Sequence, residues 1–551
     1  MRKLSITLSF SILFSITAGC ASTPAEDRQQ SQFENLLQQT YAADQPGAVV
    51  VISRDNQVVY SAARGMADIE LDVPLTKEHI LLLASLTKQY TAAAILQLAQ
   101  QGHLTLDDTV AELLPDIELP DITVHQLLNH TSGIKSYTNI PGYWTDERMR
   151  RDLTTEQLIE VIMAEEADFA PGEDMRYNNS GYVLLGAIIE QLSDKPWYEY
   201  IAEDLLQPAG IEHTRFYPAA DIVPGRVSGY DYQEGPVNTP WISMTQPHAA
   251  GALSATALDV DRWQRALHQG HIIDSEWLQL MTREDDISGS YGYGLVTGSL
   301  RGQPAVLHSG GVNGFSSFAL WLPEQQLSVV VLSNYFLYQP DTQKTAFRLA
   351  AIALDQPFPI EKEVVQLSAE QLNKVTGTYE IESGTKRTLH LQDGQLISHR
   401  EGGRSVPVEA VDENQFVLQN SLVYFETLSN QEGKVTGVNF YQLGEAEPEY
   451  AEKVSDSVET RLRIELDPEQ MERLMGDYEI QPGFIISIAT SNGQITGQAT
   501  GQPAFPLYAE AEDVLYNDEH GIELRFELEA DQPASGLVLH QAGQRIPASR
   551  L

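Results

Sequence analysis

A serine and a lysine three positions apart give the first sign of covalent chemistry in this sequence. Ser85 and Lys88 begin an apolar-periodic stretch that predicts a helix over residues 85–101, so both side chains project from one face, about one turn apart. A serine hydroxyl is a weak nucleophile until a base takes its proton. A lysine can be that base only where burial or nearby positive charge lowers its pKa. The pair therefore predicts a nucleophilic serine with a lysine partner.

The same Ser-x-x-Lys spacing occurs twice more, so the motif alone is weak. Ser132 with Lys135 and Ser383 with Lys386 both lie in glycine-containing loop contexts, and neither is followed by an apolar helix. Only the first pair stands at the entry to a long apolar helix, which favours it as the reactive one.

Two further polar clusters complete a candidate site. Tyr177 and Asn179 precede a predicted helix over residues 181–192, where the phenol can shuttle a proton and the amide can hold the lysine or a substrate. Tyr137 and Asn139 repeat this spacing but run into a Pro-Gly turn, so we reject them. The second cluster is His308-Ser309-Gly310-Gly311, a glycine-rich strand edge whose N–H groups can approach substrate and stabilise an oxyanion.

Ser-x-x-Lys, Tyr-x-Asn and a Lys-Thr-Gly-like triplet, in this order, resemble the penicillin-recognising serine hydrolases, and the resemblance covers residues 33 to about 355. Connecting segments at residues 122–134, 208–214 and 250–254 agree with the class C-like branch of β-lactamases, DD-peptidases, D-aminopeptidases and esterases. The resemblance implies that Ser85 is the nucleophile, Lys88 its base partner, Tyr177 the general base and acid, and Asn179 an orienting residue. It places His308, Ser309 and Gly310 against the substrate, with the N–H groups of Ser85 and Gly311 as the oxyanion hole.

His308 departs from the commonest pattern of that family. Many members carry lysine there, a permanent cation for the substrate carboxylate, whereas histidine with an ordinary pKa near 6.5 is mostly neutral at neutral pH. Gly311 also lacks the hydroxyl that members cleaving β-lactams often place there. Both changes disfavour an efficient β-lactamase, and an ordinary His308 predicts an activity limb around pH 6 to 7.

The resulting functional prediction is an acyl-enzyme serine hydrolase acting on amide bonds, such as D-aminoacyl peptides, or on esters. An esterase or weak β-lactamase on the same residues remains an alternative, as does a non-catalytic penicillin receptor or cell-wall-binding protein. We expect small-molecule or peptide substrates, no cofactor and no metal. His268 and His271 lack a metal-binding context, so we interpret them as surface histidines. The sequence does not determine the oligomeric state.

The elements around these motifs predict an α/β fold of the β-lactamase and transpeptidase kind: an antiparallel sheet flanked by helices, with a helical subdomain. Strands are expected at residues 47–53, 57–62, 315–322 and 327–332, and helices at residues 124–128, 155–165 and 258–267. Both ends of residues 33–358 then contribute strands to one sheet.

An internal repeat with an offset of 99 residues occupies the rest of the chain. The segment around Gly377 and Tyr379 recurs around Gly476 and Tyr478. Each copy resembles a small lipocalin-like antiparallel barrel, which predicts β-barrel repeats at residues 359–450 and 459–551. The glutamate-rich stretch 443–458 is interpreted as the linker between them.

The net charge of the chain and its N-terminal sequence predict where in the cell the protein is located. With 77 acidic and 35 basic residues the formal net charge is −42, which disfavours nucleic acid as a partner and suits a solvated surface in salty surroundings. A basic start and an apolar run predict a signal peptide at residues 1–19. Thr-Ala-Gly-Cys20 resembles a bacterial lipobox with threonine in place of the usual aliphatic residue. We expect lipidation at Cys20, a polar tether over residues 20–32, and a periplasmic protein anchored in the cell envelope, at the outer membrane.

Overall fold

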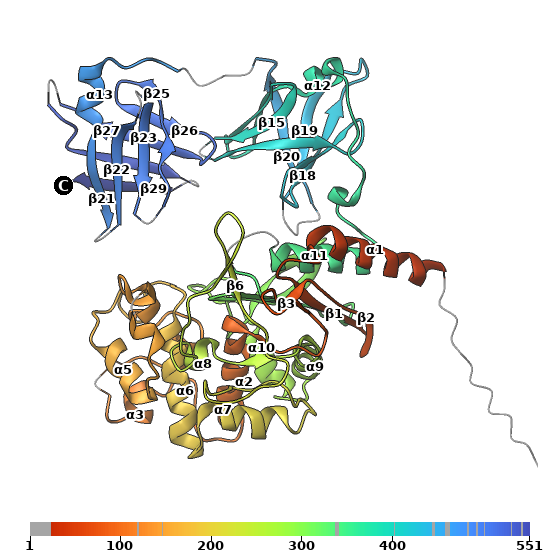
Figure 1. Ribbon diagram of the computed structural model, residues 1–551, viewed down its shortest axis with the longest axis vertical. Coiled ribbons are helices and arrows are strands. Elements are labelled where there is room, and N and C mark those ends of the chain that lie inside the picture. Colours follow the sequence, from red (N-terminus) through yellow and green to blue (C-terminus); the bar gives the residue numbers. More distant parts are fainter. Residues whose placement is uncertain are drawn as a thin grey trace, which may run out of the picture.

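The computed structural model describes residues 24–551, apart from residues 118, 120, 146, 337–340, 402, 443–446, 458–462, 482–483, 492–493, 501, 530–531 and 542–543. The predicted signal peptide and Cys20 lie outside the described residues. The chain forms an α/β unit followed by two β-barrel units, which lie together on one side of it (Figure 1). None of the described helices is both long enough and apolar enough to cross a membrane.

The α/β unit is built on a six-stranded antiparallel sheet that both ends of the unit complete. Its order is β2-β1-β12-β11-β10-β9. The strands are β1 (Ala48–Arg54), β2 (Gln57–Arg64), β9 (Val296–Leu300), β10 (Gln303–Val312), β11 (Phe315–Leu322) and β12 (Leu327–Ser333). Successive side chains of β1 enter different cores: Val49 and Val51 pack on one face, and Val50 and Ile52 on the other. This alternation explains why the strand is apolar throughout, since helices cover both faces.

One face of the sheet carries the helices that position the site. The central helix α2 (Thr87–Gln100) is buried on nearly all sides and packs against α6 (Asn179–Ser193) and α8 (His248–Gly251), while α9 (Ala257–His268) lies against β1 and β12. Smaller elements complete this unit: α3 (Val110–Leu113), α4 (Val124–Leu128), α5 (Thr155–Met163), α7 (Trp197–Tyr200), α10 (Ser275–Met281), and the strand pairs β3 (Met66–Asp68) with β4 (Val73–Pro74), β5 (Leu81–Leu82) with β8 (Ser254–Ala255), and β6 (Tyr230–Tyr232) with β7 (Pro236–Asn238).

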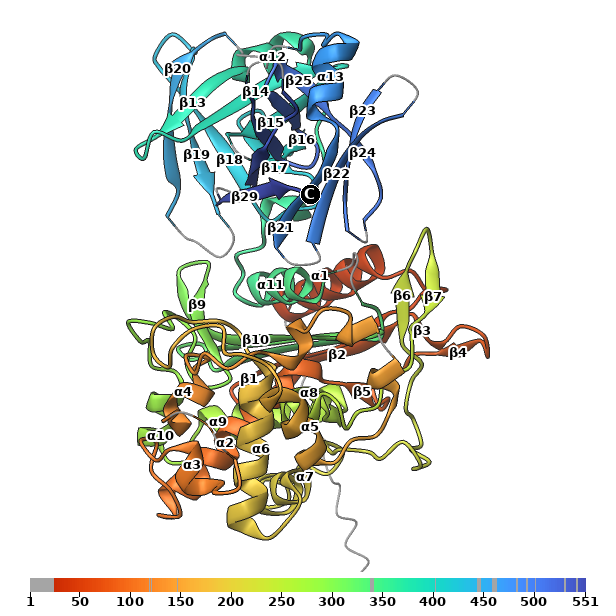
Figure 2. The same cartoon turned by 90° about the vertical axis from the view of Figure 1, so that its left-hand side faces the viewer.

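The other face is covered by helices from the two ends of the unit, α1 (Pro24–Thr40) and α11 (Thr342–Ala353), which lie side by side (Figure 2). The prediction of a polar tether up to residue 32 is therefore wrong for residues 24–32. The side chain of Gln29 donates to the carbonyl of Ile352 at 3.0 Å, and Arg28 pairs with Asp355. The segment is polar because only one side of α1, with Phe33, Leu36 and Leu37, enters the core.

The first barrel is a closed eight-stranded sheet. In chain order its strands are β13 (Gly377–Ile381), β14 (Lys386–Gln392), β15 (Gln395–Arg400), β16 (Ser405–Ala410), β17 (Gln415–Leu418), β18 (Tyr424–Ser429), β19 (Val435–Tyr441) and β20 (Glu449–Ser455). Helix α12 (Ala369–Val375) precedes it and begins with a capping box between Ser368 and Gln371.

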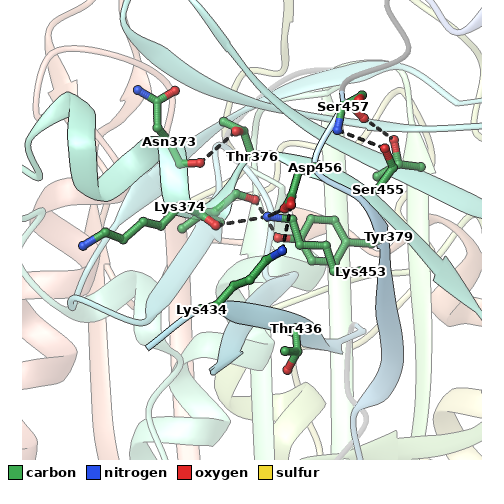
Figure 3. A network of polar contacts seen from close by, with 12 residues as sticks. Asn373, Lys374, Thr376, Tyr379, Lys434, Thr436, Lys453, Ser455, Asp456 and Ser457 are labelled. Atoms are coloured by element: carbon green, nitrogen blue, oxygen red, sulfur yellow. Dashed lines mark hydrogen bonds and ion pairs between the residues drawn. The ribbon is translucent and has the colours of Figure 1, made fainter. Parts of the chain in front are cut away.

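Strand β20 corrects the predicted linker and the predicted end of this barrel at residue 450. It lies within the glutamate-rich stretch 443–458 and pairs with both β13 and β19, so it closes the barrel. Lys453 and Lys434 both bond Asp456, at 2.9 and 2.8 Å, and Lys453 also donates to the carbonyl of Lys374, which fixes the end of β20 (Figure 3). The acidic composition suggested a linker because β20 has Glu449 and Glu452 on its exposed surface and Ala451 as its one fully buried residue.

The second barrel is nearly closed. Its nine strands run in the order β24-β23-β22-β21-β29-β28-β27-β26-β25, so the two end strands are consecutive in the chain. They are β21 (Gly476–Gln481), β22 (Phe484–Ser491), β23 (Gln494–Ala499), β24 (Phe505–Pro506), β25 (Tyr508–Ala511), β26 (Val514–Asn517), β27 (Ile522–Glu527), β28 (Gly536–Gln541) and β29 (Gln544–Arg550), preceded by α13 (Pro468–Leu474).

The repeated tyrosines have the same structural role in both barrels. The buried hydroxyl of Tyr379 donates to the carbonyl of Val375, and that of Tyr478 donates to the carbonyl of Leu474. Each bond ties the first strand of a barrel to the end of the preceding short helix. The sequence repeat is therefore also a structural one.

The first barrel shares a core with the α/β unit. Val411, Val417 and Leu422 of the barrel belong to the same buried cluster as Phe347 of α11. The hydroxyl of Tyr424 accepts a hydrogen bond from Arg301 at 2.9 Å. The barrel is thus packed on the α/β unit and is not a loosely tethered appendage.

Candidate active site

The proposed nucleophile stands at a strained turn. Ala84, with φ of 48°, is in the left-handed region that L-residues other than glycine rarely adopt, and Ser85 follows in a 3₁₀ turn that leads into α2. The hydroxyl of Ser317 on β11 donates to the carbonyl of Leu83, and Leu83 N–H donates to Leu253. These bonds hold the backbone on which the strained conformation depends.

Lys88 is fully buried and surrounded by three acceptors. Its Nζ lies 3.2 Å from Oγ of Ser85, 2.8 Å from Oδ1 of Asn179 and 2.9 Å from the carbonyl oxygen of Ala250. Burial holds the pKa of Lys88 well below its ordinary value, which favours the neutral amine. A neutral amine has two hydrogens and one lone pair. The hydrogens match the two carbonyl-type acceptors, and the lone pair is then free to face the Ser85 hydroxyl.

Asn179 has a fixed amide orientation. Its Nδ2 donates to Oγ1 of Thr138 at 3.0 Å, so its Oδ1 is left to face Lys88. The preceding residue, Asn178, caps α6 by accepting from Gly181 N–H. Thr138 comes from the Tyr-x-Asn copy that the sequence analysis rejected. The rejected motif therefore orients Asn179 through Thr138, and its tyrosine has no assigned part in the chemistry.

Tyr177 lies at the mouth of the cleft above Ser85 and Lys88. Its hydroxyl is hydrogen-bonded to Ser85, and its ring centroid is 4.8 Å from Nζ of Lys88. Burial raises the pKa of Tyr177 above its ordinary value, and the bond to Ser85 only partly offsets this. Tyr177 as a whole residue keeps 38% of its surface exposed and lines the cleft, so it also forms part of the substrate-accessible wall. A raised pKa keeps the phenol protonated, in the form that can donate a proton.

His130 is a buried residue of the site that received no role from the sequence. Its Nδ1 accepts from Asn178 N–H at 3.1 Å, which places the ring proton on Nε2. The ring centroid lies 4.5 Å from those of both Tyr177 and Tyr291. Burial and the neighbouring Lys88 hold the pKa of His130 well below its ordinary value. The histidine therefore packs as a neutral aromatic support behind Tyr177.

His308 is buried and bonded on both ring nitrogens. Its Nδ1 lies 2.6 Å from the carbonyl oxygen of Ser309, so it donates there, and Nε2 is left to accept from the Tyr291 hydroxyl at 3.0 Å. Burial, with Lys88 nearby, lowers the pKa of His308 to about 4. The predicted activity limb around pH 6 to 7 is therefore wrong for this residue. The sequence offered no signal for Tyr291, which lies in a Tyr-Gly-Tyr-Gly stretch that predicts only a turn.

Strand β10 brings glycine backbone against the nucleophile. A Cβ on Gly310 would lie 2.3 Å from the carbonyl oxygen of Leu83 and 3.0 Å from Ser85 N. Only glycine permits this approach. Gly311 follows on the same strand and, with Ser309 and Gly310, lines the cleft that contains Ser85. The N–H groups of Ser85 and Gly311 are thus on adjacent segments, as an oxyanion site requires.

The two other Ser-x-x-Lys copies are not brought to the site. Ser132 is buried, and Lys135 forms an ion pair with Asp168 at 2.9 Å, so its amine is bonded to that carboxylate. Ser383 is exposed on the first barrel. His268 is half-buried and stacks on the ring of Trp321 with a centroid separation of 5.2 Å, so it is not a surface histidine. Among the described residues, no group of three or more His, Cys, Asp or Glu side chains is arranged to hold a metal ion.

These residues line an open cleft of about 370 Å³, bounded by Tyr177, Tyr291, His308, the β10 glycines and Gln343 of α11. An antiparallel sheet between helices, with a serine–lysine pair at the start of a central buried helix, defines the class of β-lactamase and transpeptidase-fold serine hydrolases. The sequence profile of the β-lactamase family matches residues 33–354, and the chain belongs to that family.

Several known proteins resemble the chain over much of its length. Penicillin-binding protein 4* of Bacillus subtilis (strain 168) is 24% identical over 424 residues, which cover 72% of this chain and 92% of that protein. A solved D-stereospecific amidohydrolase from Streptomyces sp. is 28% identical, with a TM-score of 0.51, and covers 57% of this chain and 97% of its own. The octameric penicillin-binding protein homologue from Pyrococcus abyssi is 26% identical, with a TM-score of 0.53, and covers 77% of this chain and 99% of its own.

Proposed function

We propose that this serine hydrolase cleaves amide bonds of D-aminoacyl amides or peptides through an acyl-enzyme on Ser85. One observation carries the proposal: the buried Lys88 amine, with its lowered pKa, lies 3.2 Å from the serine hydroxyl and has acceptors for both of its remaining hydrogens. This arrangement prepares a base for the nucleophile without any further group.

Acylation begins with transfer of the Ser85 proton to Nζ of Lys88, as Oγ attacks the substrate carbonyl carbon. The carbonyl π electrons move to oxygen, and the N–H groups of Ser85 and Gly311 stabilise that oxyanion. When the tetrahedral intermediate collapses, the bond to the leaving nitrogen breaks. Tyr177 gives its proton to that nitrogen and regains one from the Lys88 ammonium, which lies beside its ring.

Deacylation uses the same residues with water as the nucleophile. As water attacks the ester carbonyl, it gives a proton to the Tyr177 hydroxyl, which passes its own proton to the neutral amine of Lys88. Ser85 Oγ then leaves and regains its hydrogen, which restores the resting state. Over the whole cycle one water is consumed, the amine is released in the acylation step and the acid is released in the deacylation step.

The amide preference rests on two features. A relative that is 28% identical is described as a D-stereospecific amidohydrolase. In addition, His308 is neutral at physiological pH and offers no cation beside the nucleophile for a β-lactam carboxylate. An esterase on the same residues is the second candidate, because an ester needs less assistance to its leaving group. A purely binding role is disfavoured by the prepared Lys88–Ser85 pair.

Activity screening tests this proposal. We expect the purified protein to hydrolyse D-aminoacyl amides faster than their L-enantiomers, to turn over a short p-nitrophenyl ester, and to hydrolyse a chromogenic cephalosporin slowly or not at all. Ser85→Ala abolishes turnover, whereas the matched Ser132→Ala retains it. Efficient cephalosporin cleavage with no amidase activity would contradict the substrate assignment. Turnover by Ser85→Ala would contradict the mechanism.

We also propose that the protein is a periplasmic lipoprotein acylated on Cys20, anchored in the outer membrane. The support is the apolar leader and the lipobox-like Thr-Ala-Gly-Cys20 sequence. Several acyl chains on one cysteine hold a protein firmly, since each buried CH₂ contributes about 0.8 kcal/mol. Cys20→Ser should move activity from the membrane fraction to the soluble fraction of the producing cell. An unchanged distribution would show that the cysteine is not the anchor.

A further inference from the structure

A second cavity lies between the α/β unit and both barrels. We call it the interdomain pocket, and its volume is about 680 Å³. Residues of all three units line it, among them Ser316, Lys344, Arg404, Pro407, Asn420 and Glu519. It also shares Ser309 and Gln343 with the catalytic cleft, so the two cavities are contiguous at these residues. The volume is in the range typical of small-molecule and peptide sites.

Two cations face this pocket. Lys344, in the first turn of α11, donates from Nζ to the carbonyl of Asn420 at 3.1 Å, which places its ammonium at the junction with the first barrel. Arg404 comes from the loop before β16 and is exposed. Among the described residues, its guanidinium has no hydrogen-bond or ion-pair partner, so it is available to a ligand anion.

The second barrel fixes the position of Arg404. Ser405 N–H donates to the carbonyl of Asp518 at 2.7 Å. Gly521, with φ of 61°, passes so close that a Cβ there would lie 2.7 Å from Arg404 N. The loop of the first barrel that carries Arg404 is therefore held against the second barrel. The turn of the second barrel that makes these contacts also places Glu519 on the pocket wall. The second barrel thus contributes to the interdomain pocket in two ways: it holds the Arg404 loop in place, and it supplies Glu519 to the pocket wall.

The catalytic cleft itself lacks a cation. None of the described residues that line it is Lys or Arg, and its histidine is neutral at physiological pH. The adjoining interdomain pocket, which shares Ser309 and Gln343 with the cleft, supplies two positive charges for a substrate carboxylate, those of Arg404 and Lys344. The leaving group must lie on the side of Tyr177, its proton donor, and Tyr177 and Gln343 line the same cleft.

We propose that the interdomain pocket binds the leaving-group half of a peptide substrate, with Arg404 and Lys344 receiving its C-terminal carboxylate. The assignment rests on the proposed function of the catalytic cleft. It implies a leaving group long enough to pass Gln343 and place its carboxylate in the interdomain pocket, and a dipeptide leaving group is the one tested below. Two carboxylates among the described lining residues, Glu519 and Asp341, oppose the substrate carboxylate and so limit its affinity, which suits a product that must be released.

Binding can be tested separately from turnover. Full-length Ser85→Ala protein is titrated by calorimetry with D-alanyl-glycyl-glycine and with its C-terminal amide. We expect the free acid to bind about tenfold more tightly than the amide, because a charge-assisted hydrogen bond of moderate strength contributes a difference of that size. In the Ser85→Ala background, Arg404→Gln and Lys344→Gln each reduce this ratio, and Glu519→Gln increases it.

Lys386→Gln is the matched control, since Lys386 is an exposed cation of the same barrel that does not line the pocket. It should leave the ratio unchanged. Equal binding of acid and amide, or a ratio that Arg404→Gln and Lys344→Gln do not alter, overturns the pocket assignment. Failure of the proposed function would be detected in a different measurement, the activity screen, as absence of ester and amide turnover by the unmodified protein.

Discussion

The hydroxyl of Tyr291 lies 3.0 Å from Nε2 of His308, and this bond determines the chemical state of the histidine. Because Nδ1 already donates to Ser309, Nε2 must accept, so the ring is neutral and held in one tautomer. A lysine at this position would bring a permanent charge to the substrate. Here a tyrosine–histidine pair instead anchors the β10 backbone at Ser309, next to the glycines that approach Ser85.

Removing the Tyr291 hydroxyl should affect both stability and activity. Tyr291→Phe leaves Nε2 of His308 buried without a partner, at a cost of about 1–3 kcal/mol in the free energy of unfolding. We expect kcat to fall more than KM rises, because β10 loses its fixed position at the oxyanion site. Tyr293→Phe is the control: it breaks a comparable bond, 2.7 Å from Nδ1 of His125, outside the cleft. Equal kcat losses in the two variants would mean that Tyr291 has only a structural role.

Acid should destabilise the protein through its buried histidines. The pKa of His308 is lowered from 6.5 to about 4 in the folded protein, so the unfolded chain binds more protons between these values. The contribution of His308 is therefore fully present above about pH 6.5 and is lost as the pH falls toward 4. It amounts to at most about 3 kcal/mol.

His248 is also buried, and its pKa is lowered to about 3, so it adds to the effect. Urea unfolding at pH values between 7 and 4 measures the slope, which His308→Gln should reduce. If the slope of His308→Gln matches that of the unmodified protein, His308 is charged in the folded state and its assigned neutrality is wrong.

Lys88 and Lys135, the lysines of the first two Ser-x-x-Lys motifs, should respond differently to the same substitution. Lys88→Met removes the base and should lower kcat by roughly 10³-fold. Stability should change little, because the gain from no longer burying an amine is offset by the loss of the partner of Asn179 Oδ1 and of the Ala250 carbonyl. Lys135→Met should leave kcat unchanged and reduce stability by at most about 1 kcal/mol, because Asp168 loses its 2.9 Å partner but keeps Arg176 at 3.1 Å. Active Lys88→Met protein would exclude Lys88 as the base.

The sequence predicted the parts of the site that are encoded locally. Ser85 and Lys88 are one helical turn apart, and Tyr177 and Asn179 precede one helix, so short-range spacing was sufficient to suggest them. Tyr291 and His130 were not predicted as site residues, because only the tertiary structure brings them to the rings they support. No spacing rule relates a turn tyrosine to a histidine on a neighbouring strand.

The fold was predicted where apolar patterning is strong and mispredicted where it is weak. Strands such as β11 and β12 are rich in apolar residues and almost entirely buried, and the predicted bounds follow them closely. Strand β20 was assigned to a linker and residues 24–32 of helix α1 to a tether, since both segments are mostly polar and exposed. Polar composition indicates exposure of one side and does not by itself exclude secondary structure.

Removing both barrels should harm solubility more than chemistry. Every side chain assigned to the catalytic steps precedes Val312, so a chain ending after Asp355 should still turn over a small ester. However, Val411, Val417 and Leu422 share a core with Phe347 of α11, and their loss exposes apolar surface on the α/β unit. We expect a lower Tm and aggregation detectable by light scattering.

A chain ending at residue 457 provides the matched comparison. It keeps the first barrel, including β20 and its anchoring residue Asp456, and therefore keeps the shared core. We expect it to stay soluble and to retain ester turnover, while losing the contacts of Asp518 and Gly521 that hold the Arg404 loop. Its preference for peptides with a free carboxylate should therefore weaken. If the shorter chain is as soluble and as stable as the longer one, the shared core does not contribute to stability as the packing implies.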